Sequence, residues 1–181
     1  YGSIMEVHAI AGDNFIGGED FTTLLCTMYL EKAAVTPESL DLRTMNEVLK
    51  AAEACKCAFS QSNEVTMSCT IDAQTFDMHL TLSEYEKACA PLLEKLRRPI
   101  ERSLRDAGVS LSDIDQIVLV GGATRLPIIR RFVTRLFGRI PGMLVDPDEA
   151  VAVGAALQCG MKARDKEIQE VVLADACPYT L

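Results

Sequence analysis

Four consecutive apolar residues, 117–120, lead directly into Gly121 and Gly122, and Pro127 then opens a segment with helical spacing. The apolar run predicts a buried strand, and proline favours the first turn of a helix. Because glycine lacks a Cβ atom, the two glycines permit a sharp turn and let a ligand lie against the backbone at the carboxyl end of the strand. The pattern also fits a plain tight turn. It therefore predicts a strand-turn-helix corner but does not decide whether a ligand binds there.

Strand-like and helical segments alternate on both sides of this corner. The predicted helices cover residues 19–34, 42–60, 127–137 and 147–161. The predicted extended segments cover residues 4–10, 117–120, 143–145 and 171–174. Strands that alternate with helices in this way predict an α/β layer.

The middle of the chain has a different pattern. Residues 64–72 and 75–81 alternate apolar and polar side chains around Ala73 and Gln74, which predicts an antiparallel hairpin. A helical stripe follows, and the residues expected to restart, kink and end it are Pro91, Pro99 and Gly108. We therefore expect a helix-and-hairpin insertion in the α/β layer.

Charge and composition exclude several classes of protein. The chain of 181 residues has a formal net charge of −8, which opposes general binding to nucleic acid. Its seven cysteines are scattered and odd in number, so we expect reduced thiols in a cytoplasmic protein, and with two histidines we expect no metal site. No apolar run approaches the ~20 residues that span a bilayer, so no membrane association is expected. The opening residues lack an initiating methionine, which predicts a fragment.

One helical face carries three different polar groups. Glu53, Lys56 and Ser60 stand at positions i, i+3 and i+7 of the predicted helix over residues 42–60. A carboxylate, an ammonium and a hydroxyl therefore share one face. From the pattern alone, we interpret this face as solvated and joined by a salt bridge.

Two further corners place polar groups at helix starts. Gly17 and Gly18 precede the first helix, whose bare backbone amides could receive a phosphate, although a plain turn explains them equally. Asp146 is expected to cap the helix over residues 147–161. Capping leaves Asp148 without an assigned role.

Three stretches of sequence occur in a set order and spacing. They read AGDNFIGGEDF at 11–21, IVLVGGATRLP at 117–127 and DPDEAVAVGAALQ at 146–158. Together they closely resemble the seventy-kilodalton heat-shock chaperones of the DnaK type, and the resemblance extends from Met5 to the end of the chain. It implies an α/β, actin-like ATPase (ribonuclease H-like) fold of two lobes around a nucleotide cleft, of which this chain is similar to the second lobe.

The resemblance also implies an organisation into subdomains. Residues 17–87 resemble the outer (IIB-like) subdomain, an inserted helix-plus-antiparallel-hairpin unit. Residues 1–16 and 88–181 resemble the inner (IIA-like) subdomain. The expected cofactor is ATP or ADP, with Mg²⁺ held mainly by the other lobe.

By the same resemblance, ten residues approach the nucleotide. Gly121, Gly122, Ala123 and Arg125 would line the adenosine and Asp148 would stand near it. The outer clamp on ribose and adenine would be formed by Glu53, Lys56 and Ser60, which reverses our interpretation of a solvated face. The residues nearest the phosphates would be Gly17 and Gly18.

The sequence departs from the family pattern at two of these positions. Many members have an arginine where Cys57 stands and a serine where Ala123 stands. Cysteine has no planar cation to stack on adenine, so we expect weaker binding or faster exchange, worth on the order of 1 kcal/mol. With the divergent hairpin, this departure points to the HscC branch.

The residues that cleave ATP in this family have no counterpart here. No run resembling Asp-Leu-Gly-Thr-Thr or Asp-Leu-Gly-Gly-Gly occurs in the sequence. Phosphoryl transfer depends on preorganised charge around the γ-phosphate and metal, so we expect no catalytic residue and no ATP hydrolysis by this piece alone. The parent is expected to be an ATP-driven chaperone of the stress response.

The resemblance implies several partners and leaves two rivals. Expected partners are the first lobe, unfolded client proteins bound by a separate domain, a J-domain co-chaperone and a nucleotide exchange factor. One rival is another actin-like ATPase, such as a sugar kinase or filament protein. The other is an interaction module whose nucleotide site has decayed.

Overall fold

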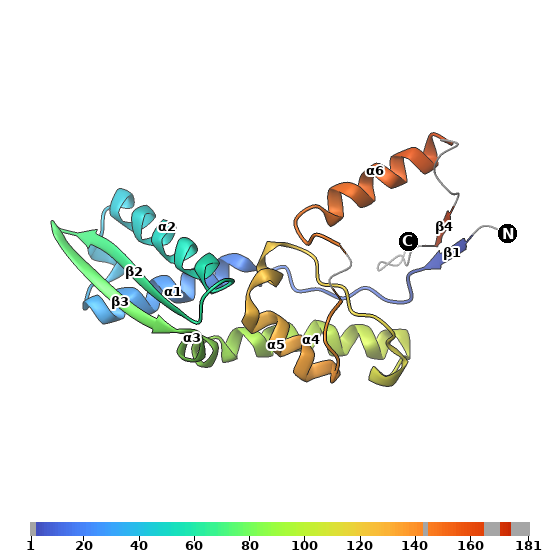
Figure 1. Ribbon diagram of the computed structural model, residues 1–181, viewed down its shortest axis with the longest axis horizontal. Coiled ribbons are helices and arrows are strands. Elements are labelled where there is room, and N and C mark those ends of the chain that lie inside the picture. The colour runs from blue at the N-terminus through green and yellow to red at the C-terminus, as the bar shows by residue number, and fades with distance from the viewer. Residues whose placement is uncertain (1–2, 143–144, 165–170, 175–181) are drawn as a thin grey trace.

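The computed structural model describes residues 3–142, 145–164 and 171–174, and the structural statements below concern those residues. Helices α1, α2 and the β2–β3 hairpin gather at one end of the molecule, α4 and α5 lie in the middle, and α6 with β1 and β4 lies at the other end (Figure 1). The main helices are α1 (Gly18–Ala33), α2 (Leu42–Ala58), α3 (Leu82–Ala88), α4 (Ala90–Ala107), α5 (Pro127–Phe137) and α6 (Ala150–Lys162). Short 3₁₀ turns cover Pro37–Ser39, Leu111–Asp113 and Gly122–Arg125.

The predicted hairpin is confirmed, with its turn one residue earlier than expected. Strands β2 (Glu64–Ile71) and β3 (Gln74–Thr81) pair antiparallel from Glu64 opposite Thr81 to Ile71 opposite Gln74. The turn is formed by Asp72 and Ala73, whose φ values are 48° and 64°. Two successive left-handed residues match the twist of the flanking strands, which explains the register.

A single apolar core joins α1, α2, α3 and the hairpin. Leu25, Val48 and Ala52 are fully buried between the first two helices. The Tyr29 hydroxyl lies 3.0 Å from the Cys69 carbonyl oxygen and 2.8 Å from that of Phe76, which ties α1 to both strands. Burial of these side chains supplies the main stabilisation of this end of the molecule.

Helices α3 and α4 begin and end where the sequence predicts breaks. Thr81 and Glu84 form a capping box at the start of α3, and Pro91 lies in the first turn of α4. Gly108 ends α4 with φ 67°, a conformation that favours glycine. The Glu86 carboxylate accepts hydrogen bonds from Arg131 and Arg135, so α3 is joined ionically to α5.

The predicted strand over residues 117–120 is wrong. Val118 makes one isolated bridge with Gly142, and no further strand pairing is described for these residues. Ile117 and Leu119 pack against the core, whereas Val118 and Val120 are exposed, so the segment is one-sided instead of buried. A strand requires a continuous hydrogen-bonded ladder with a neighbour, and this segment makes only the single bridge to Gly142.

The terminal strands pair as a short parallel unit. Strand β1 (Ser3–Glu6) pairs with β4 (Val171–Ala174), which confirms the predicted strand over residues 171–174. The first strand ends four residues earlier than predicted. The Val7 amide makes one more hydrogen bond to the Ala174 carbonyl, at 2.8 Å, and the ladder stops there.

Helix α6 starts later and is more exposed than the sequence suggests. Residues 147–149 form a turn, and the helix begins at Ala150. Val151 is 73% exposed and Leu157 is 49% exposed, so the small-residue run does not pack closely on a described neighbour. Of the predicted extended piece over residues 143–145, Met143 and Leu144 lie outside the described residues. No helix in the described part of the chain is long and apolar enough to cross a membrane.

Candidate functional site

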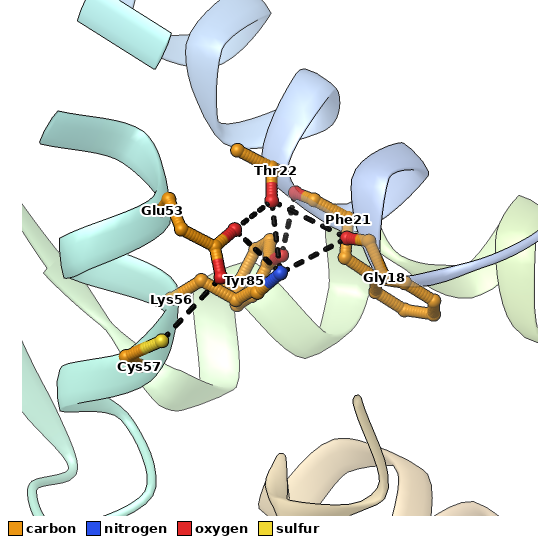
Figure 2. A network of polar contacts seen from close by, with 7 residues as sticks. All are labelled: Gly18, Phe21, Thr22, Glu53, Lys56, Cys57 and Tyr85. Carbon is orange, nitrogen blue, oxygen red and sulfur yellow. Dashed lines mark hydrogen bonds and ion pairs between the residues drawn. The ribbon is translucent and has the colours of Figure 1, made fainter. Parts of the chain in front are cut away.

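The Lys56 ammonium is the centre of a polar network between α1 and α2 (Figure 2). Its Nζ atom lies 3.1 Å from the Gly18 carbonyl oxygen, 2.9 Å from Thr22 Oγ1 and 2.6 Å from Glu53 Oε2. The Lys56 side chain is only 12% exposed. Glu53 and Lys56 therefore face α1, and the solvated-face interpretation is wrong for the lysine.

Thr22 completes this network, although it is not among the site residues predicted from the sequence. Its hydroxyl accepts a hydrogen bond from Lys56 and donates one to Glu53 Oε2. Thr22 is the buried polar residue of α1, one helical turn after Gly18. A hydroxyl in an otherwise apolar stripe was the signal available in the sequence.

The protonation of Glu53 reflects this setting. Burial raises the pKa of the Glu53 carboxyl, but the hydrogen bonds from Lys56 and Thr22 outweigh burial and hold the pKa below its ordinary value. The carboxylate is therefore the form that the folded chain favours.

We expect the contribution of Glu53 to stability to depend on pH. Because its pKa is lower in the folded than in the unfolded chain, the carboxylate stabilises the fold above the unfolded-state pKa, and this stabilisation is lost as the pH falls through the folded-state value. The difference in unfolding free energy between wild type and Glu53→Gln should shrink as the pH falls below about 4.5, the ordinary Glu value. Urea unfolding of both proteins across this range measures it, and a difference that grows on acidification contradicts the assignment.

Cys57 lies one turn beyond Glu53 on α2, whereas Ser60 lies in the turn that follows the helix, which ends at Ala58 and not at residue 60 as predicted. The Cys57 thiol donates to Glu53 Oε1 at 3.5 Å. Partial burial and the adjacent carboxylate raise the pKa of this thiol. The Ser60 hydroxyl donates to the Cys57 carbonyl at 2.7 Å, so its lone pairs are left to accept a hydrogen bond.

The diglycine corner is fastened to the segment that precedes α6. The Gly121 amide donates to the Pro147 carbonyl at 2.7 Å. Arg125 Nε lies 2.8 Å from Asp148 Oδ2, and Arg125 Nη2 lies 2.9 Å from Asp146 Oδ1. The two carboxylates raise the pKa of Arg125, Asp148 more than Asp146.

Asp146 has a different role from the one predicted. Its Oδ1 atom accepts from the Asp148 amide at 2.9 Å as well as from Arg125, and α6 starts after Glu149. The predicted helix cap at Asp146 is therefore wrong. The side chain orders the turn ahead of α6 and binds the arginine of the opposite corner.

Lys56 of α2 and Ala123 of the diglycine corner both approach Gly18 at the start of α1. A methyl group placed on Gly18 would lie 3.5 Å from Ala123 Cβ and 3.5 Å from Lys56 Nζ. A methyl group on Gly122 would lie 3.1 Å from Asp148 Oδ1. Three segments that are far apart in the sequence therefore converge on two glycines.

Gly17 differs from Gly18 because its backbone amide is bonded within the protein. Its amide donates to the Asp20 carboxylate at 2.7 Å, so this donor is already used within α1.

A separate apolar cavity of about 600 Å³ lies between the 11–16 segment, α4 and α5, and none of the predicted site residues lines it. Within the described residues, no group of three or more histidine, cysteine, aspartate or glutamate side chains is arranged to hold a metal ion.

Gly121 is the glycine of this site whose backbone requires glycine. Its φ is +91°, whereas Gly12 has no such constraint, and a methyl group on either residue meets nothing within 4 Å. We expect Gly121→Ala to lower the unfolding free energy by about 1–2 kcal/mol through backbone strain. Gly12→Ala is the matched control and should change stability by less than ~0.5 kcal/mol. Equal effects of the two substitutions in denaturant unfolding would refute a role for the Gly121 conformation.

Comparisons with known proteins agree with the motifs. The family model described as Hsp70 protein matches residues 2–181. The chain is 40% identical over 190 residues to the chaperone protein DnaK of Deinococcus deserti, covering 98% of this chain and 30% of that protein. The DnaK of Deinococcus proteolyticus is 36% identical over 190 residues, with the same two coverages.

A relative from a plant organelle is similar to the same extent. The stromal 70 kDa heat shock-related protein, chloroplastic, of Pisum sativum is 36% identical over 188 residues, covering 98% of this chain and 26% of that protein. The chain thus spans between 26% and 30% of the length of these relatives.

Proposed function

Because the chain belongs to the Hsp70 family, we propose that it is the adenosine-holding lobe of an ATP-dependent protein-folding chaperone. The observation that carries the proposal is the convergence at Gly18, where Lys56 and Ala123 both come within contact distance of an added methyl group. Bare backbone beside a few convergent polar groups is the usual make-up of a small-molecule site.

The polar groups suit the hydrogen-bond donors of a nucleoside. Glu53 Oε1 and the Ser60 lone pairs are acceptors. The hydroxyls of ribose and the amino group of adenine are donors, so the two sets are complementary. Gly122 and Arg125 would border the base, with Asp148 beside them, and Gly18 would lie toward the phosphates.

The division of labour between lobes is part of this proposal. Residues 17–87 form the outer subdomain, and residues 1–16 and 88–181 form the inner one, of an actin-like ATPase fold. The first lobe supplies the phosphate loops and most of the Mg²⁺ ligands. This lobe alone does not hydrolyse ATP, because its sequence contains neither phosphate loop.

The setting in the cell follows from the same proposal. A separate domain binds unfolded clients, and nucleotide state changes the angle between the lobes and with it the grip on the client. A J-domain co-chaperone and a nucleotide exchange factor regulate the cycle. The protein acts in the cytoplasm as part of the stress response. The departure at Cys57, together with the divergent hairpin, supports the HscC branch.

Cys57 offers a direct prediction about affinity. We expect Cys57→Arg to tighten ADP binding roughly fivefold, because a guanidinium can stack on the adenine face and such a contact is worth about 1 kcal/mol. Titration calorimetry on the full-length protein measures the change. Cys159→Arg, at an exposed position on α6, adds the same charge away from the site and should leave affinity unchanged. Equal tightening by both substitutions would indicate a general charge effect.

A nucleotide-decayed interaction module is the second candidate. The observations that favour it are the Arg125 guanidinium, which is already engaged by Asp146 and Asp148, and the cysteine at position 57, which supplies no cation from α2. Such a module would keep the fold and bind other proteins through it. A sugar kinase or another actin-like ATPase would instead transfer phosphate to an acceptor or polymerise.

Titration of the full-length protein with ADP separates these functions. We expect saturable binding well below millimolar ADP, and Glu53→Gln should weaken it about tenfold, because a charged acceptor becomes a neutral one. No detectable heat at millimolar ADP supports the decayed module. Peptide-stimulated ATP turnover would exclude both rivals.

A further inference from the structure

Charge is distributed unevenly along the chain. Residues 87–139 contain eleven lysines and arginines against five aspartates and glutamates, whereas the rest of the sequence contains seven against twenty-one. The basic stretch includes α4 and α5, which lie in the middle of the molecule (Figure 1). A protein with a formal net charge of −8 therefore has one region that attracts an acidic partner, while the remainder repels it.

A groove of about 640 Å³ lies in this basic region, bordered by α3, α4 and α5. Its wall on α4 consists of residues 90, 93, 94 and 97, which share one face of that helix. The apolar side chains of the groove are Leu93, Phe132 and Leu136. Leu93 and Phe132 are 8% and 7% exposed, so they form the floor, and Leu136 is only half-buried.

The rim of the groove carries an excess of cations. Arg135 shares the carboxylate of Glu86 with Arg131, so this group of three charges keeps a net positive charge. Lys87 is exposed at the end of α3, and no ion pair to it is found in the part of the chain that the structure describes. The rim thus offers positive charge beside an apolar floor.

Arg97 is the cation whose donors are least satisfied. Its Nε atom is buried and has no hydrogen-bond partner among the described residues. The Glu94 carboxylate lies 3.3 Å from Nε but outside hydrogen-bond geometry, and Glu101 lies 3.9 Å from Nη1. The side chain is 43% exposed, so its outer N–H groups remain accessible from the groove. A guanidinium in this state is suited to a further carboxylate.

We propose that the groove bordered by α3, α4 and α5 binds an acidic amphipathic helix of a partner protein. The apolar stripe of that helix lies on Leu93, Phe132 and Leu136, and its carboxylates meet Arg97 and Lys87. The α4 wall rises about 10 Å, which is the length of two helical turns, and a groove with apolar anchors is a common seat for a helix. None of the predicted nucleotide residues lines the groove, so this proposal does not depend on the proposed function.

Binding of a designed peptide to the full-length protein tests the charge and the apolar floor. The probe is a fluorescent helical peptide of about 18 residues with a leucine stripe flanked by glutamates. Fluorescence anisotropy should show binding at least about tenfold tighter than that of the same peptide with lysine for every glutamate. Raising the salt from about 0.05 to about 0.3 M should weaken it severalfold. Equal binding of both peptides, or of a peptide with alanine for every leucine, would overturn the proposal.

Substitutions in the rim locate the probe. Lys87→Gln and Arg97→Gln should each weaken binding of the acidic probe about three- to fivefold, because each removes one charge of the rim. Arg98→Gln is the matched control, since Arg98 follows Arg97 on α4 but is exposed and does not line the groove. It should bind within about twofold of wild type. Equal weakening by Arg98→Gln would indicate a general charge effect and contradict a site in the groove.

Two other results would assign the groove or the probe differently. Lys87 is exposed, so Lys87→Gln should leave the circular dichroism spectrum and the unfolding midpoint unchanged and tests the site even if Arg97→Gln unfolds. Probe binding that neither substitution changes would place the peptide elsewhere, for example in a client-binding domain, and would refute the proposal. Self-association of the protein in sedimentation experiments that Lys87→Gln abolishes would make a second copy the occupant, and would refute it as well.

Discussion

Replacing Phe59 with alanine is expected to lower the free energy of unfolding by about 3–5 kcal/mol. The ring is 1% exposed and stacks on Tyr85 with 5.3 Å between the ring centroids and 17° between the planes. It follows the last residue of α2 and closes the core against α3. Truncation removes the buried area and leaves a cavity that the flanking helices cannot fill. Urea unfolding followed by circular dichroism measures the loss.

Phe15 provides the matched control for this substitution. It is the same residue type but 87% exposed. Phe15→Ala should therefore change the unfolding free energy by no more than ~0.5 kcal/mol. Similar losses for both variants would mean that Phe15 is covered in the protein in solution, contrary to the structure.

Replacing Lys56 with methionine is expected to destabilise the chain by about 2–3 kcal/mol. Removing one partner of a buried ion pair typically costs about 3–5 kcal/mol, and the half-exposed Glu53 side chain reduces that figure because water reaches it. The Gly18 carbonyl and the Thr22 hydroxyl lose a charged donor at the same time. Methionine keeps the length of the aliphatic stem, so packing is largely preserved.

Lys50 is the control on the same helix. It is exposed, and no ion pair to it is found within the described residues. Lys50→Met should alter the unfolding free energy by less than ~0.5 kcal/mol. Equal destabilisation by the two substitutions, measured in denaturant, would contradict the stabilising role of the Lys56 contacts between α1 and α2.

Elements whose signal is local could be predicted from the sequence. The apolar spacing of α1, α2 and α5 gave their bounds to within two residues, because helix periodicity depends only on nearby positions. The hairpin was found by its alternation, but its turn was placed one residue late. Left-handed φ values at Asp72 and Ala73 decide that register. An Asp-Ala pair predicts this conformation less strongly than an Asn-Gly pair would.

Elements that depend on distant partners could not be predicted from the sequence. The run over residues 117–120 is as apolar as a central strand, yet its one bridge is to Gly142. Whether an apolar segment becomes a strand depends on which neighbours reach it, and that information lies elsewhere in the chain. The same limit explains α6, where Asp146 binds Arg125 across the fold and the helix starts later than its capping pattern suggests.

In the candidate site, too, features within one helix could be predicted, whereas contacts between helices could not. Glu53, Lys56 and Ser60 could be grouped because they fall on one predicted helix, although α2 ends at Ala58, before Ser60. The approach of Lys56 to Gly18 depends on how α1 and α2 pack, and so do the contacts of Thr22 with Glu53 and Lys56. Spacing on one helix carries no information about a hydroxyl on the next one.

The hydrogen bond from the Gly121 amide to the Pro147 carbonyl joins the two corners that border the proposed base site. At 2.7 Å it is a short, well-formed hydrogen bond, so separating the loop ahead of α6 from the diglycine turn requires breaking it. A displacement of this loop that keeps the bond would carry the diglycine turn with it.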